Sequence, residues 1–123
     1  MPDDLAGKRY ADIPDGHLLA MPAGVRISLA VLSGNDAGAV FYIGDPVTVI
    51  GRGGCDVILN DTEVSRGHAQ IEIRDTNYTL RDLKSTNGTY INEQNIHAAP
   101  LDNRTEFRVG STIMMFLTTK DEY

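Results

Sequence analysis

Three short polar segments of the sequence carry side chains that together can hold an anion. Gly51-Arg52 follows one apolar run, Ser65-Arg66-Gly67-His68 precedes another, and Ser85-Thr86-Asn87-Gly88-Thr89 separates two more. An arginine offers a planar fork of donors and a permanent positive charge, and hydroxyl and amide groups add further donors. This chemistry suits a phosphate group, whose binding needs donors and a cation but no group that makes or breaks bonds.

Each segment taken alone also has an ordinary interpretation. Most arginines in loops are simply solvated, so Arg52 by itself favours a surface turn. A serine such as Ser65 commonly ends a polar turn before a strand, and Asn87-Gly88 is a common hairpin sequence. The three segments form a site only if the fold brings them together, so the elements between them decide the question.

The sequence around these segments predicts strands. Apolar residues alternate with polar or small ones over 25–31 and again over 69–74, so each run has one face to bury. Shorter candidate strands lie at 40–43, 47–50, 57–59, 78–83, 89–91, 105–109 and 112–117. Turn-forming Gly, Pro, Asn and Asp separate the runs, and no long run carries the helical spacing of apolar residues. Many short strands without a helix predict a β-sandwich or barrel.

The order and spacing of the polar segments resemble the motifs of the forkhead-associated (FHA) domain. That family carries Gly-Arg, then Ser-x-x-His about a dozen residues later, then Thr-Asn-Gly about twenty further, and residues 51–52, 65–68 and 86–88 follow the same order. The resemblance extends over roughly residues 25–117. It implies an all-β, FHA-like β-sandwich of about eleven mostly antiparallel strands. It also implies recognition loops at one end that bind phosphothreonine peptides.

The resemblance assigns five residues to the phosphopeptide. Arg52 is similar to the family's loop arginine that donates to the phosphate, and Ser65 to the serine whose hydroxyl and backbone amide reach it. Thr86 is similar to the residue that completes this cradle, and Asn87 to the one that hydrogen-bonds the peptide backbone. Arg66, next to the serine, is expected to add a second positive contact.

Three residues are expected to support the site. Gly51, His68 and Gly88 match structural positions of the family, and Gly88 allows a positive φ that other residues disfavour. His68 is expected to be a partly buried imidazole that ties the Ser65 loop to its neighbour. The alternative for His68 is a protonated ring in direct contact with the phosphate, with binding that strengthens as the pH falls toward 6.

One residue is expected to select the peptide. Glu63 occupies the position that in the family often chooses the side chain three places after the phosphothreonine, the +3 residue. Asp61 lies nearby in the same loop. Because like charges repel, the sequence predicts that an acidic +3 residue is disfavoured and an apolar or basic one is accepted.

The predicted function is phosphothreonine-dependent protein binding in Ser/Thr kinase signalling, which recruits a partner or regulates an attached domain. The alternative is a phosphate-independent structural or dimerisation FHA domain of a larger protein. The set of Arg52, Ser65, Thr86 and Asn87 argues against that alternative, because a pure scaffold needs none of these polar groups.

Enzyme activity, metal binding and cofactors are not predicted. The single cysteine, Cys55, stands beside Asp56, whose charge raises rather than lowers a thiol pKa. Asp and Glu residues are scattered without the spacing of metal ligands. The Gly-rich stretch 51–54 lacks the third glycine and the helix of a dinucleotide-binding loop.

Length and composition bound the remaining possibilities. The 123 residues suit one domain, and 11 basic against 17 acidic residues give a net charge of −6, which argues against a nucleic-acid partner. No apolar run approaches the ~20 residues that span a bilayer, and no export signal is evident, so a cytoplasmic protein without a membrane partner is expected. The predicted limits are a flexible tail over 1–23, the FHA domain over 24–119 and a short end over 120–123.

Overall fold

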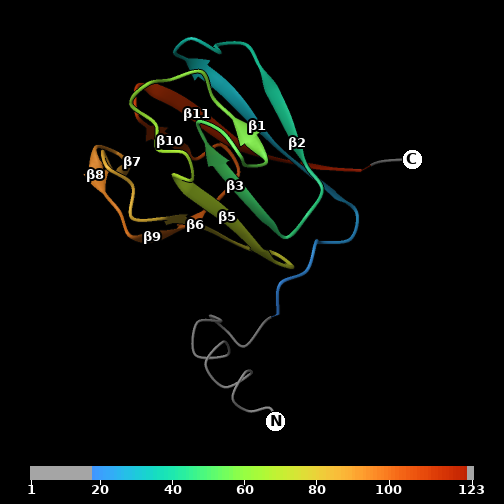
Figure 1. The fold of residues 1–123 in the computed structure, drawn as a ribbon. Coiled ribbons are helices and arrows are strands. Elements are labelled where there is room, and N and C mark those ends of the chain that lie inside the picture. The colour runs from blue at the N-terminus through green and yellow to red at the C-terminus, as the bar shows by residue number, and fades with distance from the viewer. Residues whose placement is uncertain (1–17, 122–123) are drawn as a thin grey trace, which may run out of the picture.

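Eleven strands in two sheets and no helix make up residues 18–121, the part of the chain that the computed structural model describes (Figure 1). One sheet has the order β2 (Val40–Ile43), β1 (Val25–Ser33), β11 (Thr112–Lys120), β10 (Glu106–Val109), β7 (Thr89–Ile91) and β8 (Gln94–Asn95). The other has the order β4 (Val57–Ile58), β3 (Val47–Gly51), β5 (Ala69–Arg74), β6 (Asn77–Asp82) and β9 (Ala98–Leu101). Only β3 and β4 pair in parallel among these strands, so the predicted, mostly antiparallel β-sandwich is confirmed.

The alternating pattern of the sequence is visible in which side chains are buried. In β1, Ile27, Leu29 and Val31 are buried while the residues between them are not. The partner strand β11 places Phe116 opposite Leu29 and Met114 opposite Val31, and both are buried as well. The two sheets enclose one apolar core in this way, and its burial is the main source of stability for a rigid frame.

Two strands that the sequence pattern missed, β8 and β9, lie at sheet edges. Strand β8 has two exposed polar residues and shows no apolar alternation. Strand β9 contains Pro100, which lacks a backbone donor and is therefore tolerated only at an edge. Edge strands need no apolar outer neighbour, so pattern alone predicts them poorly.

The predicted tail falls largely on residues 1–17, which lie outside the described residues, as do residues 122 and 123. The described part of the tail is attached to the domain. The amide of Ala20 donates to the Ile73 carbonyl at 2.9 Å, and the Ala20 carbonyl accepts from the Asp75 amide at 2.8 Å. At the other end of the chain, the Asp121 amide donates to the Gly24 carbonyl at 2.9 Å.

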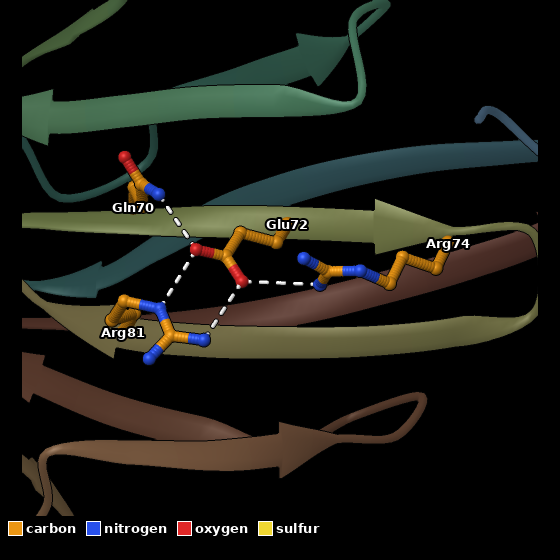
Figure 2. A network of polar contacts seen from close by, with 4 residues as sticks. All are labelled: Gln70, Glu72, Arg74 and Arg81. Atoms are coloured by element: carbon orange, nitrogen blue, oxygen red, sulfur yellow. Dashed lines mark hydrogen bonds and ion pairs between the residues drawn. The ribbon is translucent and has the colours of Figure 1, made fainter. Parts of the chain in front are cut away.

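A charged network on the outer face of the five-stranded sheet joins β5 to β6 (Figure 2). Figure 2 shows the Glu72 carboxylate between two guanidinium groups, with Oε2 2.8 Å from Arg81 Nε and Oε1 3.1 Å from Arg74 Nη1. Burial alone would raise the pKa of Glu72, but the hydrogen bonds from Arg81, Gln70 and Arg74 lower it to about 2. The network links the two neighbouring strands through their side chains, in addition to their backbone pairing.

Several connections meet at one end of the sandwich, and we call four of them the rim. They are the β3–β4 loop (52–56), the β4–β5 loop (59–68), the β6–β7 loop (83–88) and the β10–β11 turn (110–111). A carboxylate oxygen of Asp61 accepts from the Ser111 amide at 2.8 Å and from the Thr112 hydroxyl at 2.7 Å, which joins two of them. From this end, β11 runs nine residues to Lys120 at the opposite end of the domain.

Candidate functional site

Arg52 lies at the rim directly after β3. Its backbone amide donates to the Ser65 carbonyl at 3.0 Å, and its Nε donates to the Val64 carbonyl at 3.0 Å. The close approach of the two loops requires Gly51, because a Cβ there would overlap the carbonyl oxygen of Arg66. The side chain of Arg52 is exposed, and within residues 18–121 its two terminal nitrogens have no protein partner.

Ser65 and Thr86 come together from loops that are twenty-one residues apart in sequence. The Thr86 amide donates to Ser65 Oγ at 3.0 Å. That contact occupies the serine oxygen as an acceptor and leaves its hydroxyl proton to donate elsewhere. The Ser65 amide, which the resemblance had also directed toward the phosphate, donates instead to His68 Nδ1 at 3.0 Å.

His68 is fully buried and connects two loops of the rim. Its Nδ1 accepts from the Ser65 amide, so that nitrogen carries no proton, and its Nε2–H donates to the Gly88 carbonyl at 2.8 Å. The backbone of His68 itself is held between the Ile50 carbonyl and the Leu83 amide, each at 2.9 Å. A buried, neutral ring with both nitrogens engaged is an internal brace and has no face toward an exposed ligand.

Asn87 and Gly88 form the tip of the β6–β7 loop. Asn87 Nδ2 donates to the Glu63 carbonyl at 2.8 Å, while the Asn87 residue is exposed. Its side-chain oxygen therefore stays available on the surface of the rim. Gly88 has a φ of 86°, a left-handed conformation that residues with a Cβ disfavour, and its amide donates to Ser85 Oγ at 2.9 Å.

Asp82 organises this loop and was missed by the sequence analysis. It accepts from the Ser85 hydroxyl and amide and from the Thr89 hydroxyl, the last at 2.7 Å. Burial would raise the pKa of Asp82, but the hydrogen bonds from Ser85 and Thr89 lower it overall, so the carboxylate is ionised. An Asp three residues before a Ser is a pattern of side-chain-capped turns, and this signal could have identified it.

Asp61 and Glu63 have different roles, although both belong to the β4–β5 loop. Asp61 is 6% exposed, and the amides of Glu63 and Ser111 and the Thr112 hydroxyl donate to it. Burial would raise the pKa of Asp61, but these hydrogen bonds lower it overall. Its charge is thus directed inward, and Glu63 is the acidic side chain of this loop that faces solvent next to Asn87.

Cys55 of the β3–β4 loop lies near Arg66 of the β4–β5 loop. A Cβ placed on Gly54 would lie 3.5 Å from Arg66 Nη2, so this guanidinium covers the glycine turn that follows Arg52. Burial and the Asp56 carboxylate raise the pKa of the Cys55 thiol. A raised pKa makes the thiol a weaker nucleophile at neutral pH.

A β-sandwich that gathers a cation, hydroxyl groups and amides on the loops at one end is a recognition domain of the loop-binding type. Comparison with known proteins gives its family. Residues 30–120 match the family model described as "Inner membrane component of T3SS, cytoplasmic domain", which is an FHA-type domain.

No helix among residues 18–121 is long and apolar enough to cross a membrane.

Relatives and a solved structure agree with that match. The chain is 35% identical over 99 residues to the glycogen accumulation regulator GarA of Mycolicibacterium smegmatis, covering 80% of this chain and 62% of GarA. It is 36% identical over 98 residues to the oxoglutarate dehydrogenase inhibitor of Corynebacterium glutamicum, covering 79% of this chain and 68% of the inhibitor. A structure from a study of phosphothreonine-dependent FHA domain interactions superposes with a TM-score of 0.68 at 28% identity, covering 75% of this chain and 95% of that one.

This chain belongs to the forkhead-associated domain family. It spans less than two thirds of the length of GarA, since 62% of that relative is matched.

Proposed function

We propose that this domain binds phosphothreonine-containing segments of other proteins, through Arg52, Ser65, Thr86 and Asn87, with Arg66 as a second cation. The observation that carries the proposal is the bonded chain across the rim: Arg52 to the Ser65 carbonyl, Ser65 Oγ to the Thr86 amide, and Asn87 to the Glu63 carbonyl. Gly51, His68 and Gly88 hold these loops at the spacing the ligand needs.

The remaining donors match the charge of the ligand. A phosphothreonine carries about −1.5 to −2 charges and three acceptor oxygens at neutral pH. Arg52 offers its terminal nitrogens, Ser65 its hydroxyl proton, and Arg66 a second guanidinium above the glycine turn. Each hydrogen bond to a charged group contributes roughly 1.5–3 kcal/mol. Two or three of them give roughly 3–9 kcal/mol before the entropy of ordering a peptide is subtracted, so contacts to the rest of the peptide must add to the phosphate contacts for micromolar binding.

The names of the relatives support a regulatory role. One is a regulator of glycogen accumulation and another an inhibitor of oxoglutarate dehydrogenase, so both are named for what they do to other proteins or pathways. We propose accordingly that this chain acts by binding under the control of a Ser/Thr kinase and catalyses no reaction itself. Because such a kinase requires ATP, the cytoplasm is the compartment proposed for it.

Titration of a degenerate phosphothreonine peptide library tests the proposal, with fluorescence anisotropy as the measurement. The phosphorylated library should bind in the micromolar range and the unphosphorylated one should not. In Arg52→Ala the affinity should fall at least tenfold, about 1.4 kcal/mol.

Arg26→Ala is the matched control. Arg26 is also an exposed arginine, but it lies near the start of β1, at the end of the domain away from the rim, and it contacts Asp121 at 3.4 Å. Its removal should leave the affinity unchanged. Equal binding of phosphorylated and unphosphorylated libraries would overturn the proposal and favour the phosphate-independent scaffold. An Arg52→Ala variant with full affinity would remove Arg52 from the site.

A further inference from the structure

The rim carries opposite charges on the two sides of Asn87. On one side, Glu63 is exposed and its carbonyl accepts the hydrogen bond from Asn87 Nδ2. On the other side, a groove of about 530 Å³ runs from Asn87 along the β6–β7 loop toward β9 and is lined by Lys84, Arg81 and His97, among others. A peptide that crosses Asn87 therefore passes from an acidic surface to a basic one.

Lys84 supplies the unneutralised charge of this groove. It is exposed, and within residues 18–121 it forms no ion pair. Arg81 also lines the groove, but its Nε and Nη2 are bonded to Glu72 at 2.8 and 3.1 Å. Asp82 is the acidic residue of the lining, and its two oxygens accept three hydrogen bonds from Ser85 and Thr89. The Asp82 carboxylate keeps its negative charge but is directed into its own loop, whereas Lys84 is exposed.

The backbone at Lys84 holds its position close to the phosphate site. Lys84 has a φ of 57°, a left-handed conformation that costs a residue with a Cβ free energy and that glycine or asparagine would adopt more readily. It precedes Thr86 by two residues. Lys84 lines the groove together with Thr86 and Asn87, so its long, flexible side chain places an ammonium beside these residues.

We propose that this groove binds acidic residues of the peptide, and that those residues precede the phosphothreonine. The proposal rests on the proposed function and extends it from the phosphate to the flanking sequence. Since Glu63 is expected to face the +3 residue, the Lys84 side of Asn87 faces the residues before the phosphothreonine. Charge complementarity on both sides then fixes the direction of the bound peptide, with carboxylates toward Lys84 and neutral or basic residues toward Glu63.

Two synthetic peptides of identical composition test this. Both contain one phosphothreonine in a neutral background; one has two aspartates before it, and the other has the same two aspartates after it. Anisotropy titrations in 20 mM salt should give about threefold or more tighter binding of the first peptide to the unaltered protein. The preference should shrink in 300 mM salt, because exposed charges are screened.

Charge reversal at Lys84 provides the decisive comparison. Lys84→Glu should abolish or invert the preference while leaving the dependence on phosphorylation intact. Lys120→Glu, the same charge change at the far end of β11, should keep the preference of the unaltered protein. A preference that persists in Lys84→Glu, or tighter binding of the second peptide by the unaltered protein, would overturn the proposal. If the unaltered protein binds phosphorylated and unphosphorylated peptides equally well, the proposed function itself is refuted, and the groove's role with it.

Discussion

Replacing His68 by leucine should destabilise the domain although the two side chains are similar in size. The imidazole is fully buried and makes one hydrogen bond through each ring nitrogen, to the Ser65 amide and to the Gly88 carbonyl. Leucine fills the space but leaves a donor and an acceptor of the backbone without partners. An unsatisfied buried group costs about 1–3 kcal/mol. Because both groups are partly buried, the expected loss in the free energy of unfolding is about 2–4 kcal/mol.

Urea denaturation followed by circular dichroism measures this loss. A change of about 3 kcal/mol lowers the midpoint by about 1–3 M for m-values of about 1–3 kcal/mol/M. His97→Leu is the matched control, since His97 is exposed, and it should change the stability by less than about 0.5 kcal/mol. Binding measured at low temperature, where the variant is folded, should also weaken, because Ser65 and Gly88 lose their common brace.

Partial restoration sharpens the test. His68→Gln places an amide near the position of Nε2 and His68→Asn places one near Nδ1, so each should recover part of the stability that leucine loses. If His68→Leu is as stable as the unaltered protein, the brace contributes nothing and the account of how the rim is held is wrong.

Two other perturbations follow from the contacts of the fold. Gly51→Ala should disrupt the rim, because the new Cβ overlaps the Arg66 carbonyl, whereas Gly44→Ala should be tolerated, because no atom lies within 4 Å of a Cβ there. Thermal melting and phosphopeptide binding measure the effect of both variants. A well-folded Gly51→Ala variant with full affinity would contradict this expectation. Glu72 has a folded-state pKa depressed from 4.5 to about 2, so its contribution to stability is present above about pH 4.5 and is lost as the pH falls toward 2. Urea midpoints between pH 7 and 2 should therefore fall more steeply for the unaltered protein than for Glu72→Gln, which should already be less stable at pH 7 because Arg74 and Arg81 lose their partner.

The fold could be predicted from the sequence where strands have one buried and one exposed face. The alternation over β1 and β5 marks both strands, because every second side chain enters the same core. The same reasoning failed for β8 and β9, which lie at sheet edges. Strand β8 forms by pairing with β7, and strand β9 forms by pairing with β6. The attachment of Ala20 beside the end of β5 has no pattern in the sequence at all, since two backbone hydrogen bonds carry it.

The candidate site could be predicted as a set of residues but not as a network. Motif spacing identified Arg52, Ser65 and Thr86, and the hydrogen bonds at the rim join them. The sequence predicts that His68 ties the Ser65 loop to its neighbour, but not that the Ser65 amide is the group it engages, because that depends on the burial and orientation of the ring. The inward turn of Asp61 is of the same kind, since two of its three donors, the Ser111 amide and the Thr112 hydroxyl, come from a segment about fifty residues later.

The residues of the rim therefore form two groups, one that mainly affects peptide binding and one that mainly affects the stability of the domain. Arg52, Thr86 and Asn87 are exposed, so their loss should mainly weaken binding, and it should lower stability only through the bonds of Arg52 Nε to the Val64 carbonyl and of Asn87 Nδ2 to the Glu63 carbonyl, about 0.5–1.5 kcal/mol each. Residues such as His68 are buried, and their loss should lower stability first and affinity as a consequence. In the double variant of Arg52→Ala and His68→Asn, most of the change in unfolding free energy should come from the buried His68, because the exposed Arg52 side chain makes one hydrogen bond, to the Val64 carbonyl. The two changes in binding free energy should not add, since the Arg52 side chain and the His68 ring hold the two sides of one peptide group, the Val64 carbonyl and the Ser65 amide. Additive binding effects would mean that each loop meets the ligand independently and that the rim is not a single preformed unit.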